Sequence, residues 1–347
     1  MMRLSLLWPL VALGLIWLVI LVINPGFFAF TVQDGRVFGG LVDILNRGAP
    51  VALIAIGMSL VIATGGIDLS VGAVMAIAGA VAANLVVGTS LPVPMIILAG
   101  LGAGLAAGLV NGALVAGLGI QPIVATLILL VAGRGVAQLL NDGQIITFQN
   151  EALAFLGVGT LLGLPMPVWL VAIVLAGMLA LTRATALGLF IESVGANASA
   201  SRYAGIPVRS IKLAVYAIAG ICAALAGLVS TADIQGADAN NVGLWIELDA
   251  ILAVVIGGAS LMGGRYSLVL AVVGALIIQS LNTAIVLSGI PPKFNLVIKA
   301  MVIIAVLLLQ SSVAQAQFAS LRARLMPWSM PATYQLSSPR PSSRRYS

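Results

Sequence analysis

Long, uninterrupted runs of apolar residues dominate the chain, without the alternation of a half-buried strand or the polar face of a surface helix. Clear examples are residues 10–23, 51–63, 95–118, 168–181 and 301–309. A backbone in lipid must satisfy its hydrogen bonds within the segment, so a run of about 20 apolar residues is typical of a membrane-spanning helix. A spanning barrel strand would instead alternate apolar and polar residues over about ten positions. The pattern therefore predicts an all-α integral membrane protein.

We expect about ten transmembrane helices. They cover residues 4–23, 43–64, 68–87, 93–118, 122–140, 166–182, 211–232, 248–264, 267–287 and 296–312. The first run follows Arg3 as a signal peptide would, but it lacks a small-residue cleavage site, so we expect a retained span. Beyond about Gln315 the chain turns to Ser, Pro and Arg, a composition that cannot form a core. We therefore predict a transmembrane domain over residues 1–315 and a disordered basic tail over 316–347.

Composition agrees with this class, and the placement of charge orients the chain. Hydrophobic residues make up 61% of the 347 residues and charged residues only 7%, against about 25% charged in soluble domains. With the amino terminus inside, most basic residues outside the tail fall on the inner side: Arg3, Arg183, Arg202, Arg209, Lys212 and Arg265. Acidic residues gather on the other side: Asp34, Asp142, Glu151, Asp233, Asp238 and Glu247. Because cytoplasmic loops carry the excess of Lys and Arg, both termini are predicted to be cytoplasmic.

Small residues recur within the spans. Gly100, Gly104, Gly108 and Gly112 repeat every four residues and form one smooth ridge on the helix over 93–118. Such ridges let helix backbones approach closely in lipid, so the ridge predicts a packing surface. Residues 60–72 and 254–264 also resemble each other weakly, as repeated halves do in many transporters.

The chain lacks the usual reactive side chains. Cys222 is the only cysteine, histidine is absent, and no Gly-rich loop ends in Gly-Lys-Ser/Thr. Without these groups there is no thiol metal site, no histidine base and no phosphate-cradling loop. We therefore expect no catalytic, metal or cofactor site and no nucleic-acid partner. If ATP drives this protein, another chain must hydrolyse it.

Three polar segments interrupt the apolar background. In the first, residues 63–72, two glycines break one helix and Asp68 precedes the next. A carboxylate there could cap the next helix through the backbone N–H groups of its first turn. A capping turn at the membrane surface and a role beside a translocation path are both open.

The second segment is the long inner loop over residues 186–208. Asn197–Ala204 is prone to form a short helix, ended by Gly205 and Pro207. Such a surface helix could dock into a partner's cleft or could simply connect two spans.

The third segment is the outer stretch over residues 233–249. It is rich in carboxylates and carboxamides, which hydrogen-bond to sugar hydroxyls, and Trp245 could stack on a sugar face. A solvated loop is the plain alternative.

These segments together resemble the motifs of the ribose/xylose/galactose-type permeases of bacterial ABC importers, within the branched-chain amino acid/sugar permease superfamily. The likeness rests on residues 63–72, on Val194-Gly-Ala-Asn197 with Ala204-Gly-Ile-Pro-Val208, and on residues 246–264. Galactofuranose-type permeases are the most similar members. That finer match rests on four short stretches: Gln33-Asp-Gly-Arg-Val-Phe38, Asp43-Ile-Leu-Asn-Arg47, Gly135-Val-Ala-Gln138 and Ala237-Asp-Ala-Asn-Asn241.

The resemblance implies a type II-like ABC importer permease. Its partners would be a cytoplasmic ABC ATPase subunit, a periplasmic sugar-binding protein, a second permease subunit in a homodimer or heterodimer, and the surrounding membrane lipids. The protein itself would be no enzyme, and its place would be the bacterial inner membrane. The cargo would be a galactofuranose- or galactose-like monosaccharide or a ribose-like pentose.

The resemblance also assigns candidate residues to three roles. The residues implied in ATPase coupling are Glu192, Gly195, Asn197, Ala204 and Gly205. Those implied at the periplasmic gate or binding-protein contact are Asp238, Asn240, Asn241, Trp245, Glu247 and Asp249. The candidates to line the pathway are Asp68, Ser70, Asn111, Gln138, Gln279 and Asn282.

An ion-coupled secondary transporter of a small polar solute is the alternative. Such proteins place ionisable residues within the membrane. Arg134 and Lys299 lie in or near spans, and neither has an obvious acidic partner in the sequence. An intramembrane enzyme lacks the paired acids and histidines that proton transfer needs.

Overall fold

A computed structural model describes residues 8–33, 35–289, 291, 294, 296–301 and 304. The chain divides into two units, Met1–Ile303 and Ile304–Ser347. Only Ile304 of the second unit is described, so the fold below is that of the first. The predicted tail over 316–347 and the predicted domain boundary at 315 both lie outside the described residues.

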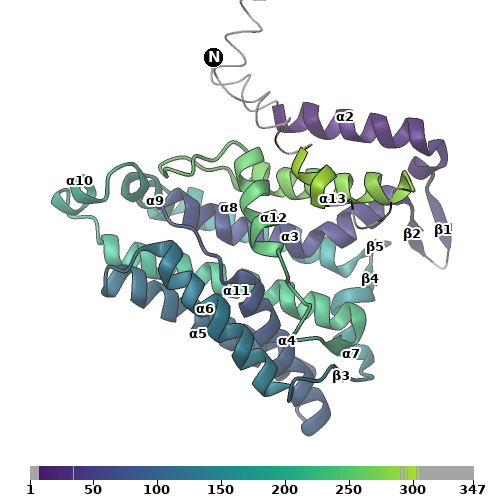
Figure 1. Ribbon diagram of the computed structural model, residues 1–347, viewed down its shortest axis with the longest axis horizontal. Helices are drawn as coiled ribbons and strands as arrows, with labels where there is room; N and C mark the ends of the chain where they lie inside the picture. The colour runs from purple at the N-terminus through teal and green to yellow at the C-terminus, as the bar shows by residue number, and fades with distance from the viewer. Residues whose placement is uncertain are drawn as a thin grey trace, which may run out of the picture. The chain divides into compact units, whose positions relative to one another are not determined.

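The first unit is built almost entirely of helices (Figure 1). They are α2 (Trp8–Ile23), η1 (Pro25–Phe28), α3 (Gly40–Ala63), α4 (Val71–Gly88), α5 (Val93–Gly112), the π-helical turn η2 (Ala113–Gly117), α6 (Pro122–Leu140), α7 (Glu151–Val158), α8 (Met166–Ala184), α9 (Leu187–Ala196), α10 (Ala198–Tyr203), α11 (Val208–Ile234), α12 (Ile246–Ile256) and α13 (Leu268–Leu287). The described residues also form three short antiparallel strand pairs. β1 (Thr31–Gln33) pairs with β2 (Arg36–Phe38), β3 (Ile146–Thr147) with β6 (Gly236–Ala237), and β4 (Thr160–Leu161) with β5 (Leu164–Pro165).

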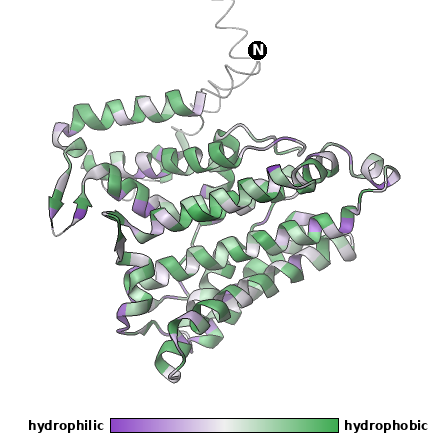
Figure 2. Cartoon of the chain, turned by 180° about the vertical axis from the view of Figure 1, so that it is seen from behind, coloured by the Kyte–Doolittle hydropathy of each residue, from purple (hydrophilic) through white to green (hydrophobic). Residues whose placement is uncertain are grey.

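Seven of the described helices are long and apolar enough to cross a membrane: α3, α4, α5 with η2, α6, α8, α11 and α13. Hydrophobic residues dominate along these helices in the view of Figure 2. Little of α8 and α6 is buried within the chain, so their outer surfaces suit lipid or another subunit. The chain is thus a multi-pass membrane protein by the length and composition of its helices.

The described residues contain seven candidate spans and not the ten that were predicted. The predicted span over 248–264 is wrong, because α12 ends at Ile256 and residues 257–267 form turns. Gly258 adopts a φ of +85°, a left-handed conformation that ends a helix and favours glycine. The first span has 16 described helical residues, Trp8–Ile23, fewer than a full crossing needs. Of the last predicted span, residues 296–301 are helical and most of the remainder lies outside the described residues.

Helix α11 lies at the centre of the packing. It contacts α5 most extensively, then α3 and α4, while α13 packs on α3, α12 and α2. The glycine ridge of α5 explains the first of these contacts. A Cβ on Gly104 would lie 2.5 Å from the carbonyl oxygen of Gly220, and one on Gly112 would lie 2.8 Å from a methyl of Leu213. The predicted packing role of the ridge is confirmed, since both positions face α11 with no room for a side chain.

Candidate functional site

The segment between α3 and α4 folds inward and carries a buried polar cluster of Asp68, Ser70 and Asn111. All three are almost fully buried. Asp68 Oδ1 accepts hydrogen bonds from the Ser70 backbone N–H at 2.9 Å, the Ser70 hydroxyl at 2.7 Å and Asn111 Nδ2 at 3.4 Å. Asn111 Nδ2 also donates to Ser70 Oγ at 2.8 Å. The cluster therefore ties the α3–α4 turn to the end of α5.

This geometry corrects one expectation about Asp68. Ser70, not Asp68, is the N-cap residue of α4, and its side chain accepts no bond from the helix. Asp68 instead accepts the N–H of the cap residue itself. The carboxylate therefore fixes the turn that leads into α4, rather than the first turn of the helix.

Tyr216 of α11 belongs beside this cluster and was not predicted. Its side chain is fully buried, and its hydroxyl, like Asn111 Oδ1, has no hydrogen-bond partner among the described residues. A Cβ on Gly66 would lie 2.7 Å from this hydroxyl, so glycine there makes room for it. The available sequence signal was a lone tyrosine within an apolar run.

The six candidate pathway residues do not gather in one place. Asp68, Ser70 and Asn111 form the buried cluster. Gln138 lies on the far end of α6, where its Nε2 donates to Asn240 Oδ1 at 2.8 Å. Gln279 and Asn282 lie on α13, where the Gln279 side chain packs over Gly48 of α3 and Asn282 Oδ1 is buried without a partner among the described residues.

The backbone of the outer segment, residues 233–249, accepts hydrogen bonds from two side chains on or just after α6. Arg134 Nη1 donates to the carbonyl oxygens of Ala239 at 3.0 Å and Val242 at 2.7 Å. Asn141 Nδ2 donates to the carbonyl oxygen of Ala237 at 3.0 Å, next to the β3–β6 pairing. The backbone of this segment is thus fixed rather than freely solvated.

The acidic candidates of the outer segment have different environments. Slight burial raises the pKa of the Asp238 carboxyl, but hydrogen bonds from Asn241 and Asn240 and the nearby Arg134 cation outweigh it and hold that pKa below its ordinary value. Burial raises the pKa of Glu247; its own backbone N–H and Arg134 oppose this rise, and Asp249 adds to it. The structure brings Asp238, Asn240 and Asn241 together in one turn, while Glu247 lies buried in the first turn of α12.

Trp245 and Asp249 flank Glu247 and face different surroundings. Trp245 adopts a φ of +65°, and its side chain is 62% exposed. Lys299 Nζ lies 2.5 Å from Asp249 Oδ1. The expectation that Lys299 lacks an acidic partner is therefore wrong, because Lys299 pairs with a carboxylate 50 residues away. Arg134 forms no ion pair among the described residues and donates to carbonyl oxygens instead.

The inner loop contains the short helix predicted from its sequence, α10, which lies at the opposite end of the unit from the β1–β2 hairpin (Figure 1). Asn197 caps it by accepting the Ala200 N–H at 2.9 Å. Ala204 ends it, and Gly205 follows with a φ of +82° and open space around its Cα. Glu192 lies on the preceding helix, in the wall of a pocket between α9 and the start of α13.

Gly195, near the end of α9, sits where three segments meet. A Cβ at this position would collide with the carbonyl oxygen of Ala63, the last residue of α3, and would lie 2.5 Å from the backbone nitrogen of Gly264. The Gly264 N–H donates to that same Ala63 oxygen at 2.9 Å. The two segments that resemble each other in sequence, 60–72 and 254–264, are therefore in direct contact, and α9 packs against both.

No group of three or more potential metal ligands from His, Cys, Asp and Glu occurs among the described residues. The arrangement offers buried hydrogen-bonding groups, an outer segment fixed by hydrogen bonds, and a helix, α9, that packs against the end of α3 and the turn after α12. These features suit a protein that moves a polar solute between helices.

Comparison with known proteins agrees with this chemistry. Residues 40–307 match the family model described as branched-chain amino acid transport system / permease component. The galactofuranose transporter permease protein YtfT of Escherichia coli is 60% identical over 310 residues, which are 88% of this chain and 90% of that protein. The fructose import permease protein FruF of Bifidobacterium longum is 41% identical over 315 residues, 88% of each chain.

A more distant relative points the same way. The ribose import permease protein RbsC of Escherichia coli is 37% identical over 306 residues, 87% of this chain and 92% of that protein. No solved structure matches. Since the family model covers most of the chain and these relatives span nearly all of it, the chain belongs to the family described as branched-chain amino acid transport system / permease component.

Proposed function

We propose that this chain is the membrane-spanning permease subunit of a bacterial ABC sugar importer. The observation that carries the proposal is the 60% identity to a galactofuranose transporter permease along almost the whole of both chains. Fructose and ribose import permeases are similar over the same extent. The protein would lie in the inner membrane with both termini in the cytoplasm.

The cargo in this proposal is a monosaccharide, with galactofuranose or a related hexose first and a ribose-like pentose second. A separate periplasmic protein would deliver the sugar, and a second permease subunit, identical or different, would complete the pathway. The exposed ring of Trp245 and the turn of Asp238, Asn240 and Asn241 supply an apolar face and polar groups for that contact.

ATP hydrolysis would take place on a separate cytoplasmic subunit. In this proposal α10 is the element that receives its motion. The position of α9 supports this role, because its residue Gly195 contacts both the last residue of α3 and the turn that follows α12. A displacement of α9 and α10 would therefore reach helices that carry both the buried cluster and the outer segment.

The test is sugar-stimulated ATP hydrolysis and sugar uptake in liposomes that contain the full chain, its ATPase and the loaded binding protein. Gly205→Val is the coupling variant, because a β-branched residue is strained at a φ of +82°. Gly35→Val is the matched control, since Gly35 has a φ of +73° and equal open space but lies in the β1–β2 hairpin.

We expect stimulation by a monosaccharide that Gly205→Val abolishes and Gly35→Val retains, with both variants folded. The ranking of sugars then identifies the cargo. An ion-coupled transporter is the second candidate, and the Asp249–Lys299 ion pair is the feature that favours it. Uptake without any ATPase, following a proton or sodium gradient, would establish that candidate and overturn the proposal.

A further inference from the structure

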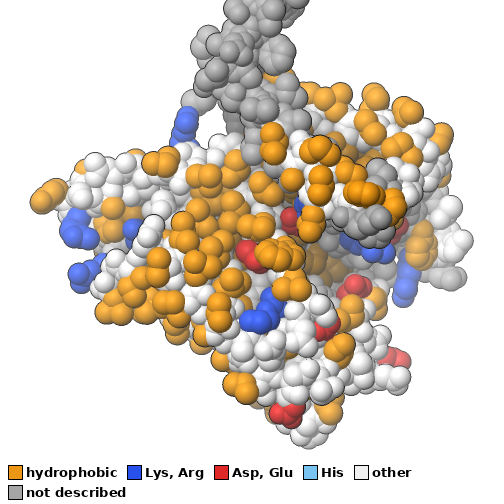
Figure 3. Space-filling model, in the orientation of Figure 1, with side chains coloured by type: hydrophobic (Ala, Val, Ile, Leu, Met, Phe, Trp, Pro, Cys, Tyr) orange, Lys and Arg blue, Asp and Glu red, His pale blue; other side chains and the backbone are white. Residues whose placement is uncertain are grey.

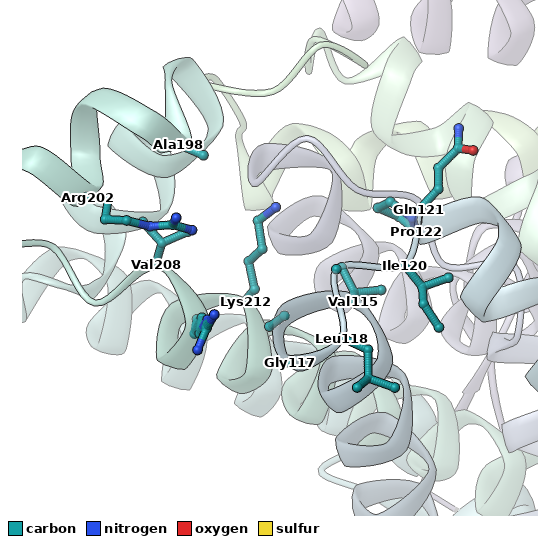
Figure 4. Close-up of a pocket in the computed structure, with 13 residues that line it drawn as sticks. Val115, Gly117, Leu118, Ile120, Gln121, Pro122, Ala198, Arg202, Val208 and Lys212 are labelled. Carbon is teal, nitrogen blue, oxygen red and sulfur yellow. The ribbon is translucent and has the colours of Figure 1, made fainter.

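A basic pocket lies where the α5–α6 turn meets the start of α11. It encloses about 390 Å³, and Figure 4 shows it with its lining side chains. Three cations line it: Arg202 from α10, and Arg209 and Lys212 from α11. The opposite wall comes from the end of η2 and the turn into α6, where Leu118 and Ile120 lie.

The cations of this basic pocket have no counter-charge among the described residues. None of the lining residues is acidic, and among the described residues none of the three cations forms an ion pair with a carboxylate. Arg202 is near enough to Lys212 to repel it. Both reach toward the same opening in Figure 4, and positive side chains gather at the α10 end of the face shown in Figure 3. Three like charges around one opening favour a bound anion.

The other wall of the basic pocket is apolar and open. Leu118 is 74% exposed, and it follows η2 directly, at the point where the α5 span ends. The α6 span begins four residues later at Pro122. The basic pocket thus lies where three candidate spans end, with Arg209 and Lys212 in the first turns of α11 and Leu118 directly after the α5 span. The ends of spans are where hydrocarbon meets water. Basic pockets between transmembrane helices at this depth bind anionic lipid headgroups.

We propose that the basic pocket binds the phosphodiester headgroup of an anionic phospholipid. Arg202, Arg209 and Lys212 hold the phosphate, and Leu118 packs against the first carbons of an acyl chain. A free phosphate has the same charged group as the headgroup, but it has no acyl chain to contact the apolar wall at Leu118. This proposal rests on the lining of the basic pocket and on where the spans end, so it does not depend on which sugar or which ATPase the protein uses.

The test uses the full-length chain, purified in detergent and stripped of lipid, without any partner. Phosphatidylglycerol or phosphatidylcholine with identical acyl chains is added back, and native mass spectrometry counts the bound lipids across a titration. Arg202→Gln/Lys212→Gln is the test variant. The control variant is Arg183→Gln/Arg265→Gln. It removes the same number of positive charges, and neither residue lines the basic pocket. Leu118→Asn tests the apolar wall, and inorganic phosphate is titrated in parallel.

We expect the unmodified chain to retain phosphatidylglycerol over phosphatidylcholine. The test variant should weaken that retention by roughly thirtyfold, the change that about 1 kcal/mol for each of two basic residues gives, and the control should not. Leu118→Asn should weaken phosphatidylglycerol binding and leave phosphate binding unchanged.

Three outcomes overturn the proposal. Equal retention of both lipids, or equal losses in the test and control variants, shows no headgroup site. Phosphate binding as tight as lipid binding shows a site for a free anion. Unchanged lipid retention in the test variant shows that these cations do not hold a lipid headgroup. A separate assembly measurement with the ATPase then tells whether the basic pocket receives an acidic protein surface instead, since assembly would be lost on that variant alone.

Discussion

Lys299 Nζ lies 2.5 Å from Asp249 Oδ1 and 2.7 Å from Asp249 Oδ2, so one ammonium group joins the first turn of α12 to the helical residues 296–301. The side chains are 12% and 20% exposed. Within a membrane protein such a pair fixes two segments that lie 50 residues apart in sequence.

We predict that breaking this pair destabilises the protein and that exchanging the charges restores it. Lys299→Met and Asp249→Asn should each cost about 1–3 kcal/mol, less than a fully buried pair because solvent reaches both groups. Thermal unfolding in detergent measures this cost for the single variants, for the double variant and for Asp249→Lys/Lys299→Asp. Additive losses in the double variant would contradict a direct coupling.

The glycine ridge of α5 supplies a second prediction. Gly104→Ala places a methyl against Ala224 and Gly220, so it should force α5 from α11 and cost about 1–3 kcal/mol. Gly102 on the same helix has open space around it. Gly102→Ala should therefore be neutral or slightly stabilising, since alanine favours a helix over glycine. Equal unfolding temperatures for the two variants would argue against close backbone packing.

Arg134 should control the order of the outer segment. Arg134→Met strands the Ala239 and Val242 carbonyl oxygens, so amide hydrogen exchange should rise across residues 236–245. Gln138→Ala, from the same helix, loses only an exposed contact with Asn240. Its exchange rates should change much less. Equal amide exchange rates across residues 236–245 in the two variants would contradict a controlling role for Arg134.

Asp68 should act through its accepted hydrogen bonds. Asp68→Ala strands the Ser70 N–H and hydroxyl in a buried site and removes the longer of two hydrogen bonds from Asn111, which should cost roughly 2–4 kcal/mol. Asp68→Asn keeps one accepting oxygen and removes a buried charge, so we expect a loss of about 1 kcal/mol or less. Unfolding temperatures compare the two variants, and equal losses would show that the charge matters more than the hydrogen bonds.

Local sequence was enough to predict much of this protein. Apolar runs locate the seven long described helices, because lipid leaves each segment to satisfy its own backbone. The spacing of Gly100, Gly104, Gly108 and Gly112 predicts a close helix contact, and Asn197 with Gly205 brackets α10. Each of these depends on neighbours within one or two helical turns.

Contacts between distant segments were decided by the tertiary structure. The apolar run over 248–264 gave no sign that α12 ends at Ile256, where the following turn packs on α3. Nor could spacing show that Lys299 pairs with Asp249, or that Tyr216 lies beside the Asp68 cluster. Hydropathy places a residue in a span, but only the packing of one helix on another determines which side chain it meets.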